Sequence, residues 1–213
     1  MQIKKNINTV EYISRATGSI VVKMATGMIR GYRNLIEVDT NFEGDFSYKK
    51  GLILYNSGKY EDAVPYLKKA IEFEPGRVEL YYKLGVSLTK IYRDDEAINY
   101  LNKGLAIDES HEQILFRLGM IFLGNEEYKK ARDSFLKVAE RGNKSYNAYY
   151  RLGMSYDGLK QYEEAIDAFE KAIEISPKER KAYHSLGFVF ESIGKHDEAV
   201  KCFKKSMELD ETT

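Results

Sequence analysis

The sequence predicts an all-α fold, a solenoid built from consecutive helical hairpins. A pattern of small and bulky residues recurs every 34 residues, apolar residues follow a three- and four-residue spacing, and 213 residues include only three prolines. The apolar spacing is that of amphipathic helices, and the scarcity of proline leaves room for long ones. One hairpin cannot cover its own apolar face, so the copies are expected to stack and share a core.

Glycines set the register of the repeat. They stand 34 residues apart, at Gly51, Gly85, Gly119, Gly153 and Gly187. Twelve residues after each glycine comes an alanine: Ala63, Ala97, Ala131, Ala165 and Ala199. Four residues beyond each alanine is a bulky apolar residue: Leu67, Leu101, Phe135, Phe169 and Phe203. The small residues predict a close approach of the two helices in each hairpin, with the large residues filling the space around that contact.

The pattern and its length resemble the tetratricopeptide repeat (TPR) family. The resemblance implies a TPR solenoid, a right-handed superhelix of helical hairpins, that binds other proteins and is not an enzyme. Pro75 and Pro177 are expected to end second helices of the repeats. The predicted units are a basic, degenerate N-terminal helical hairpin over 1–43 and five repeats over 44–77, 78–111, 112–145, 146–179 and 180–213.

The junction between the second and third repeats departs from the pattern. Glu109 stands where proline ends other repeats, and Gly104 replaces a small alanine in the preceding helix. Glycine weakens a helix by about 1 kcal/mol relative to alanine. A bend at this junction is one expectation, and ordinary sequence drift without a bend is the alternative.

The N-terminal segment is strongly basic. Residues 1–36 carry a net charge of +5, whereas the whole chain sums to zero, so residues 37–213 carry −5. The segment has helical apolar spacing, yet Thr17 and Ile29 occupy the positions of the repeat glycine and alanine. It is therefore expected either to cap the first repeat or to be loosely attached and exchanged between molecules. Its candidate residues for self-assembly or for contact with an anionic membrane surface are Arg15, Lys23, Arg30 and Arg33.

Composition narrows the cellular setting. Lysine plus arginine and aspartate plus glutamate balance at 33 each, so net charge does not favour nucleic acid as a partner. The single cysteine, Cys202, excludes an internal disulfide framework and favours a reducing compartment. No cleavable signal pattern opens the chain, and its longest N-terminal apolar stretch contains Lys23 and is too short to span a bilayer. A cytoplasmic location with at most peripheral membrane association is expected.

The resemblance to TPR proteins implies that the first helix of each repeat lines a concave binding groove. One set of positions forms an aromatic ladder, and the next forms a basic ladder. Aromatic and arginine anchors suit a peptide with apolar and acidic groups. The alternative is that the aromatic residues pack in the core and the basic residues only solvate the surface. The aromatic ladder is Tyr48, Tyr82, Phe116, Tyr150 and His184, and the basic ladder is Lys49, Lys83, Arg117 and Arg151.

Catalytic, metal and cofactor patterns are not found in the sequence. The three histidines share no metal-ligand spacing with Cys202, and no phosphate-binding glycine loop occurs. His196 occupies the position that Tyr60, Tyr128 and Tyr162 hold in other repeats, so it is expected to substitute for them in packing. No catalytic residue, no metal ligand and no cofactor is predicted.

Three stretches give a narrower resemblance. Residues 136–169 (LKVAERGNKSYNAYYRLGMSYDGLKQYEEAIDAF), 187–211 (GFVFESIGKHDEAVKCFKKSMELDE) and 12–36 (YISRATGSIVVKMATGMIRGYRNLI) resemble the MamA family, the magnetosome-associated TPR proteins of magnetotactic bacteria. The resemblance implies a scaffold that self-assembles through its N-terminal segment on the cytosolic face of the magnetosome membrane. It also implies recruitment of other magnetosome proteins for magnetite biomineralisation. The alternatives are a generic cytosolic TPR adaptor for one peptide ligand and a regulatory subunit of an enzyme complex.

Overall fold

The computed structural model describes residues 27, 28, 30, 42–141 and 145–210, and the regular structure in these ranges is helical throughout. Arg15, Lys23 and Arg33 lie outside the described residues, as does most of the predicted N-terminal hairpin. Arg30 is described and exposed.

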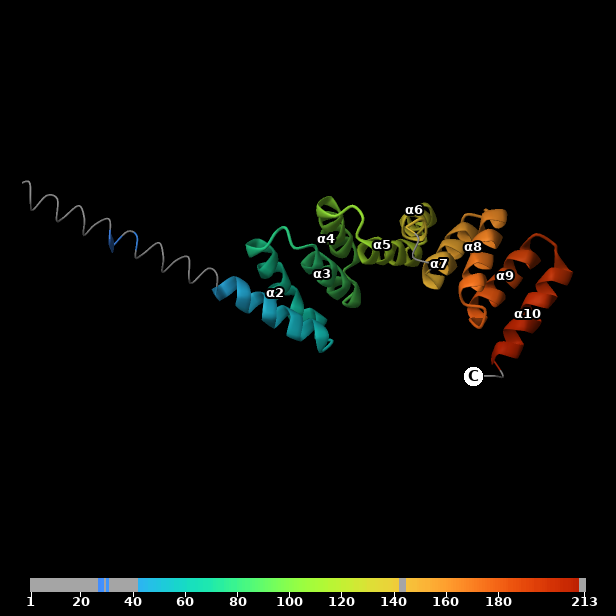
Figure 1. Cartoon of the computed structure of the whole chain (residues 1–213), viewed down its shortest axis with the longest axis horizontal. Coiled ribbons are helices and arrows are strands. Elements are labelled where there is room, and N and C mark those ends of the chain that lie inside the picture. The colour runs from blue at the N-terminus through green and yellow to red at the C-terminus, as the bar shows by residue number, and fades with distance from the viewer. Residues whose placement is uncertain (1–26, 29, 31–41, 142–144, 211–213) are drawn as a thin grey trace, which may run out of the picture.

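Helices pair into consecutive hairpins that stack in one row (Figure 1). Residues 42–56 are helical and pair with α2 (Tyr60–Phe73). The later hairpins are α3 (Val78–Lys90) with α4 (Asp94–Ile107), α5 (Glu112–Gly124) with α6 (Tyr128–Ala139), α7 (Tyr146–Gly158) with α8 (Tyr162–Ile175), and α9 (Arg180–Ser192) with α10 (His196–Asp210). The predicted all-α architecture of helical hairpins is confirmed.

The turn inside each hairpin has the same geometry. Residues spaced 34 apart adopt positive φ angles, between 59° and 78°. In the first turn the Gly58 amide donates to the Tyr55 carbonyl (3.0 Å) and the Lys59 amide donates to the Leu54 carbonyl (2.9 Å). These two bonds define a Schellman motif, which closes the end of the first helix. The positive-φ residues are Gly58, Tyr92, Glu126, Lys160 and Gly194.

Each repeat glycine receives the bulky side chain from the second helix of its own hairpin. A Cβ atom added to Gly153 would lie 2.7 Å from Phe169 Cε1, and one added to Gly187 would lie 2.6 Å from Phe203 Cε1. The repeat alanines, such as Ala131 and Ala165, have no exposed surface. The large residues therefore sit directly over the glycines as well as filling space beside them.

The hydrophobic core is shared between hairpins. One buried cluster extends from Leu54 to Ile121 and so joins the first three hairpins. The step from α4 to α5 nevertheless has the least packing of the consecutive helix pairs. Gly104 is buried there, where an added Cβ would lie 2.7 Å from Ile114 Cδ1, so glycine permits the approach of these two helices. The bend at this junction stays a prediction.

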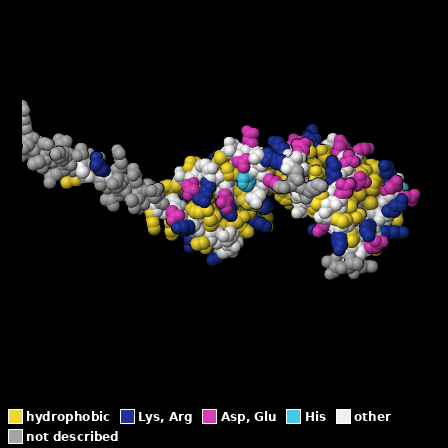
Figure 2. Space-filling model, in the orientation of Figure 1, with side chains coloured by type: hydrophobic (Ala, Val, Ile, Leu, Met, Phe, Trp, Pro, Cys, Tyr) yellow, Lys and Arg dark blue, Asp and Glu magenta, His cyan; other side chains and the backbone are white. Residues whose placement is uncertain are grey.

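Charged side chains of both signs lie on the visible face of the described hairpins (Figure 2). On the face seen in Figure 2, basic and acidic side chains are interspersed over the hairpins. Among the described helices, none combines the length and the apolar character that crossing a membrane requires.

Candidate protein-binding groove

The rings of the aromatic ladder lie half in the core. The Phe116 ring meets Phe135 edge-on at 5.4 Å between centroids, and the Tyr150 ring lies 5.8 Å from Phe169. Both contacts lie within a single hairpin and help to cover the side chain that sits on the repeat glycine. Each ring also keeps part of its surface accessible. One side of each ring therefore packs in the core, and the other side is available to a ligand.

The other three members of the aromatic ladder also pack against neighbouring side chains, and the His184 ring meets the Phe203 ring of its own hairpin at 5.9 Å. Tyr48 packs against the first core cluster, and the Arg77 guanidinium lies 4.0 Å from its ring centroid. Tyr82 also packs against that cluster, with its ring 6.1 Å from the His111 ring. His184 is exposed, and its ring meets Phe188 edge-on at 4.8 Å.

The residues of the basic ladder fall into two groups, those that form an ion pair with a nearby carboxylate and those that do not. Lys49 Nζ lies 2.7 Å from Asp45, and Lys83 Nζ lies 3.3 Å from Glu79. Within the described part of the chain, Arg117 and Arg151 have no ion pair. The Arg151 guanidinium instead lies 5.5 Å from the centroid of the Tyr150 ring. These two arginines are therefore the ladder cations available to an acidic partner.

The sequence contains a signal for this division that our sequence analysis missed. An acidic residue stands four positions before Lys49 and before Lys83, whereas amides, Gln113 and Asn147, stand four positions before Arg117 and Arg151. Residues four apart are neighbours on a helix surface, so the lysines gain a local counter-charge.

A cavity of about 220 Å³ opens beside Arg117. We call it the Arg117 pocket, and it joins three successive first helices or their starts. Tyr82 comes from α3, Ser145 and Asn147 come from the start of α7, and α5 supplies the remaining lining, namely Glu112, Gln113, Phe116 and Arg117. The sequence predicted three of these residues as groove members and missed those at the helix starts.

Burial changes two ionisable groups farther along this surface. The Tyr146 ring stacks on Tyr150 with centroids 5.7 Å apart, and burial, followed by the nearby Glu179 carboxylate, raises the pKa of Tyr146 to about 12. Burial also raises the pKa of Asp157. Both shifts favour the neutral form of the group over its charged form, because burial penalises the charged form.

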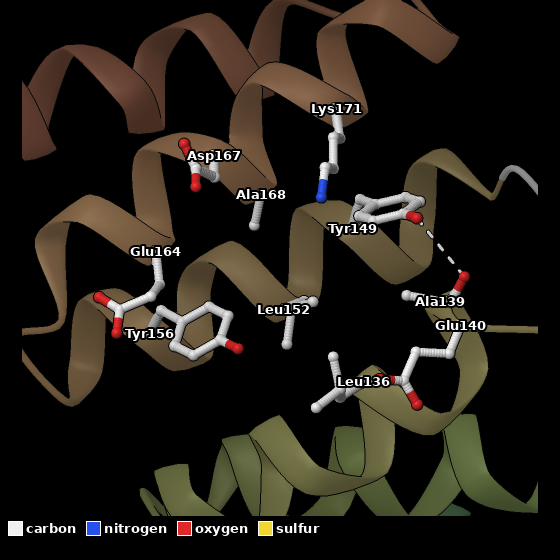
Figure 3. Close-up of a pocket in the computed structure, with 10 residues that line it drawn as sticks. All are labelled: Leu136, Ala139, Glu140, Tyr149, Leu152, Tyr156, Glu164, Asp167, Ala168 and Lys171. Carbon is white, nitrogen blue, oxygen red and sulfur yellow. Dashed lines mark hydrogen bonds between the residues drawn. The ribbon is translucent and has the colours of Figure 1, made fainter.

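A second cavity, of about 270 Å³, lies between α6 and α8 over α7, and we call it the rear cavity. Figure 3 shows its apolar floor, with Leu136 and Leu152, and the Lys171 side chain extending toward the Tyr149 ring. The Lys171 Nζ lies 5.8 Å from that ring centroid, and the Tyr149 hydroxyl donates to the Ala139 carbonyl at 3.4 Å. Helical geometry puts this lining on the side of α7 away from Tyr150 and Arg151.

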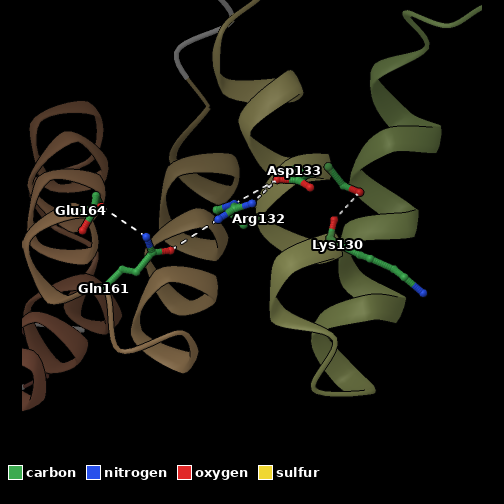
Figure 4. Close-up of polar contacts among 6 residues, drawn as sticks. Lys130, Arg132, Asp133, Gln161 and Glu164 are labelled. Atoms are coloured by element: carbon green, nitrogen blue, oxygen red, sulfur yellow. Dashed lines mark hydrogen bonds and ion pairs between the residues drawn. The ribbon is translucent and has the colours of Figure 1, made fainter.

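Polar contacts join neighbouring hairpins beside the rear cavity. Arg132 on α6 donates to the Gln161 side-chain oxygen at 3.5 Å, and the Gln161 amide donates to Glu164 at 3.4 Å (Figure 4). This short network fixes the third hairpin against the turn of the fourth.

Nothing in the described residues resembles a catalytic or metal centre. Burial raises the pKa of the Cys202 thiol, which disfavours the nucleophilic thiolate. In the same ranges no group of three or more His, Cys, Asp or Glu side chains is placed to hold a metal ion.

The repeat geometry is matched by known families. Tetratricopeptide repeat profiles match residues 51–91, 78–111, 146–179 and 181–213. The chain therefore belongs to the tetratricopeptide-repeat family and is a protein-binding scaffold in class. A search of curated proteins finds no match.

The chain is similar to several solved structures of MamA. The structure of MamA from residue 41 to its end, from Desulfovibrio magneticus RS-1, is 29% identical, covers 80% of this chain and 97% of its own, and superposes with a TM-score of 0.77. Two crystal structures of MamA are 31% and 33% identical, with TM-scores of 0.75 and 0.73. They cover 79% and 76% of this chain and 92% and 95% of their own.

Proposed function

We propose that this protein is a MamA-like scaffold that self-assembles on the cytosolic face of a magnetosome membrane and recruits other proteins for magnetite biomineralisation. The observation that carries the proposal is the likeness to MamA structures, which extends over nearly their whole length at about 30% identity. Five repeats in one register and a basic N-terminal segment are consistent with it.

Exposed apolar side chains at both ends of the row support self-assembly. In the helix over residues 42–56, Phe42 is 69% exposed and Ile53 is 63% exposed. At the other end, Val200 and Met207 on the last helix, α10, are 49% and 66% exposed. The end repeats of a solenoid expose apolar faces unless something caps them. Such surfaces favour contact with another segment or another copy.

The charge distribution supports peripheral membrane association. Residues 1–36 carry +5, and the remainder of the chain carries −5. A basic segment is attracted to an anionic lipid surface within about one Debye length, roughly 10 Å at 0.1 M salt. Arg30 is exposed and so available for such a contact.

Light scattering tests the assembly part of the proposal. The full chain is expected to form large species of broad size distribution, because a head-to-tail contact need not close into a ring. A chain that starts at Gly44 is expected to be mostly monomeric. Equal mass per particle for the two chains would contradict self-assembly through the N-terminal segment.

Vesicle sedimentation tests the membrane part. The full chain should bind anionic vesicles and not neutral ones, with binding that falls as salt rises. The matched control replaces Arg15, Lys23, Arg30 and Arg33 with Gln in the full chain and should lose vesicle binding. Binding that is unchanged by these replacements would contradict a role for the basic segment.

A generic peptide adaptor is the second candidate, and the Arg117 pocket favours it. An adaptor of that kind needs no assembly, so it would remain a monomer at all concentrations. The light-scattering measurement therefore separates the two functions.

A further inference from the structure

The Arg117 pocket contains a buried cationic donor without a partner. Arg117 Nε has almost no accessible surface and no hydrogen bond within the described residues. Its guanidinium also has no ion pair there, unlike the Lys49 and Lys83 side chains of the same ladder. Arg117 as a whole is only half-buried, and an acceptor that a ligand places against the accessible part of this unpaired cation would be bound favourably.

Helix starts add positive potential to the same cavity. Its lining includes residues from the first turns of α5 and α7, where amide groups point out of the helix. His111 and Ser145 each cap one amide, of Ile114 and Ala148 respectively, at 3.4 Å. Glu112, the one carboxylate of the lining, takes part in an interaction of its own. Arg117 and the two helix starts are the features of this lining that favour an anion.

The size and walls of the pocket indicate which anion it takes. Its volume of about 220 Å³ is below the range of roughly 300–1,000 Å³ that is typical of small-molecule sites, and so suits one side chain. Tyr82 and Phe116 form aromatic walls that accommodate the methylene groups of an acidic side chain. One unpaired guanidinium matches the single charge of a carboxylate, and the fork of its N–H groups matches the two oxygens.

We infer that the Arg117 pocket binds the carboxylate of an aspartate or glutamate side chain in an extended segment of a partner protein, with Arg117 as the anchor. The inference rests on the proposed scaffold function, since it assigns a ligand chemistry to the groove of that scaffold. Arg151, unpaired on the next first helix, lies along the same ladder and extends the preference for acidic segments.

Selection from a random nine-residue peptide library, amidated at the C-terminus, tests the inference on the full chain. Peptides that bind are expected to be enriched in Asp or Glu. Replacing the acidic residue with Gln or Asn should weaken the binding of a selected peptide at least about tenfold, as measured by fluorescence anisotropy. Arg117→Gln should cause a similar loss, and Arg117→Lys should restore part of it.

Lys49→Gln is the matched control, because Lys49 belongs to the same ladder but is exposed and already paired with Asp45. It should leave peptide affinity unchanged. Selected peptides without an acidic residue, no enrichment of any peptide, or full acidic-peptide binding by Arg117→Gln would each overturn the inference. A second library whose peptides have a free C-terminal carboxylate tests the other source of a carboxylate. Binding that requires only this terminal carboxylate, and no acidic side chain, would also overturn the inference.

Light scattering of the same variants separates this inference from the function on which it rests. Arg117→Gln should assemble like the unsubstituted chain, because Arg117 belongs to the third repeat and not to the N-terminal segment that is proposed to drive assembly. Failure of acidic-peptide binding with assembly intact would overturn the carboxylate pocket alone, whereas a full chain that stays monomeric would contradict the scaffold proposal.

Discussion

At the scale of single residues, the fit between small and large side chains fixes each hairpin. Gly153 lies beneath the Phe169 ring, and three ring atoms would lie between 2.7 and 3.0 Å from an added Cβ. Glycine is therefore needed for space rather than for backbone freedom, since these glycines lie within helices with ordinary φ angles.

Gly153→Ala is accordingly expected to destabilise the fold. Overpacking costs about 1–3 kcal/mol, which outweighs the gain of up to about 1 kcal/mol in helix propensity. Gly124→Ala is the matched control, because an added Cβ there meets nothing within 4 Å. Chemical denaturation should show a lower midpoint for Gly153→Ala than for Gly124→Ala, and the reverse order would contradict the packing argument.

His196 shows that a shared repeat position does not ensure a shared role. The sequence predicted that it packs like the tyrosines at its position, and this interpretation was wrong. The side chain is 70% exposed, and its Nδ1 lies 2.9 Å from the Glu191 carboxylate. The hydrogen bond to Glu191, followed by the charge of that carboxylate, raises the pKa of His196 above its ordinary value.

A pH dependence follows from this ion pair. Because the folded-state pKa is raised, the stabilisation is fully present below the unfolded pKa of about 6.5 and is lost as pH rises through the folded-state pKa. Glu191→Gln should return the His196 pKa toward about 6.5 in an NMR titration. An identical titration in both proteins would show that the pair does not form in solution.

At the scale of helices and turns, one proline destabilises the helix that contains it. Pro65 lies inside α2, beyond its first turn, and is exposed. Proline there cannot donate to the carbonyl four residues earlier, and its ring crowds that carbonyl. The surrounding packing of Ala63, Val64 and Leu67 holds α2 together despite this cost.

Pro65→Ala should therefore stabilise the protein, by about 1–3 kcal/mol, since a helix-interior proline costs about 3 kcal/mol relative to alanine. Thermal unfolding should show a higher midpoint. Pro75→Ala, outside the helices, is the control and should give no comparable gain. A lower midpoint for Pro65→Ala would indicate that the ring contributes packing that outweighs the lost hydrogen bond.

At the scale of the whole molecule, the row of hairpins is not uniform. Packing is thinnest between α4 and α5. Ile114 is fully buried there and belongs to the cluster that joins the first three hairpins. In a linear array of repeats, each repeat is stabilised only by its direct neighbours. The weakly packed contact between α4 and α5 is therefore where the chain should separate into two parts that unfold independently.

Ile114→Ala is expected to lower the free energy of unfolding by about 2–5 kcal/mol. It should also make α2–α4 unfold separately from α6–α10. Backbone amides of α2–α4 and of α6–α10 would then show different degrees of protection from hydrogen exchange. Val189→Ala on α9 is the control, because it truncates a fully buried residue of the last two hairpins, away from the thin step, and should lower the stability of both halves together. Equal loss of protection in both halves of Ile114→Ala would contradict the division.

Most of the fold could be predicted from the sequence because its determinants are local. Gly119 and Phe135 lie within one repeat, and so do Gly153 and Phe169, and the spacing of each pair alone indicates that two helices meet there. The neutralised lysines could have been recognised as well, from Asp45 and Glu79 four residues before them.

The candidate site needed the tertiary structure. Tyr82, Arg117 and Asn147 belong to three different repeats, and only the stacking angle between hairpins decides that they line one cavity. The same holds for the thin step at α4 and α5, where Gly104 and Ile114 meet across repeats. The sequence by itself determined the hairpin, because a hairpin is closed by contacts within 34 residues. The tertiary structure decided the pocket, because the offset between stacked hairpins depends on many small packing contacts that no single repeat contains.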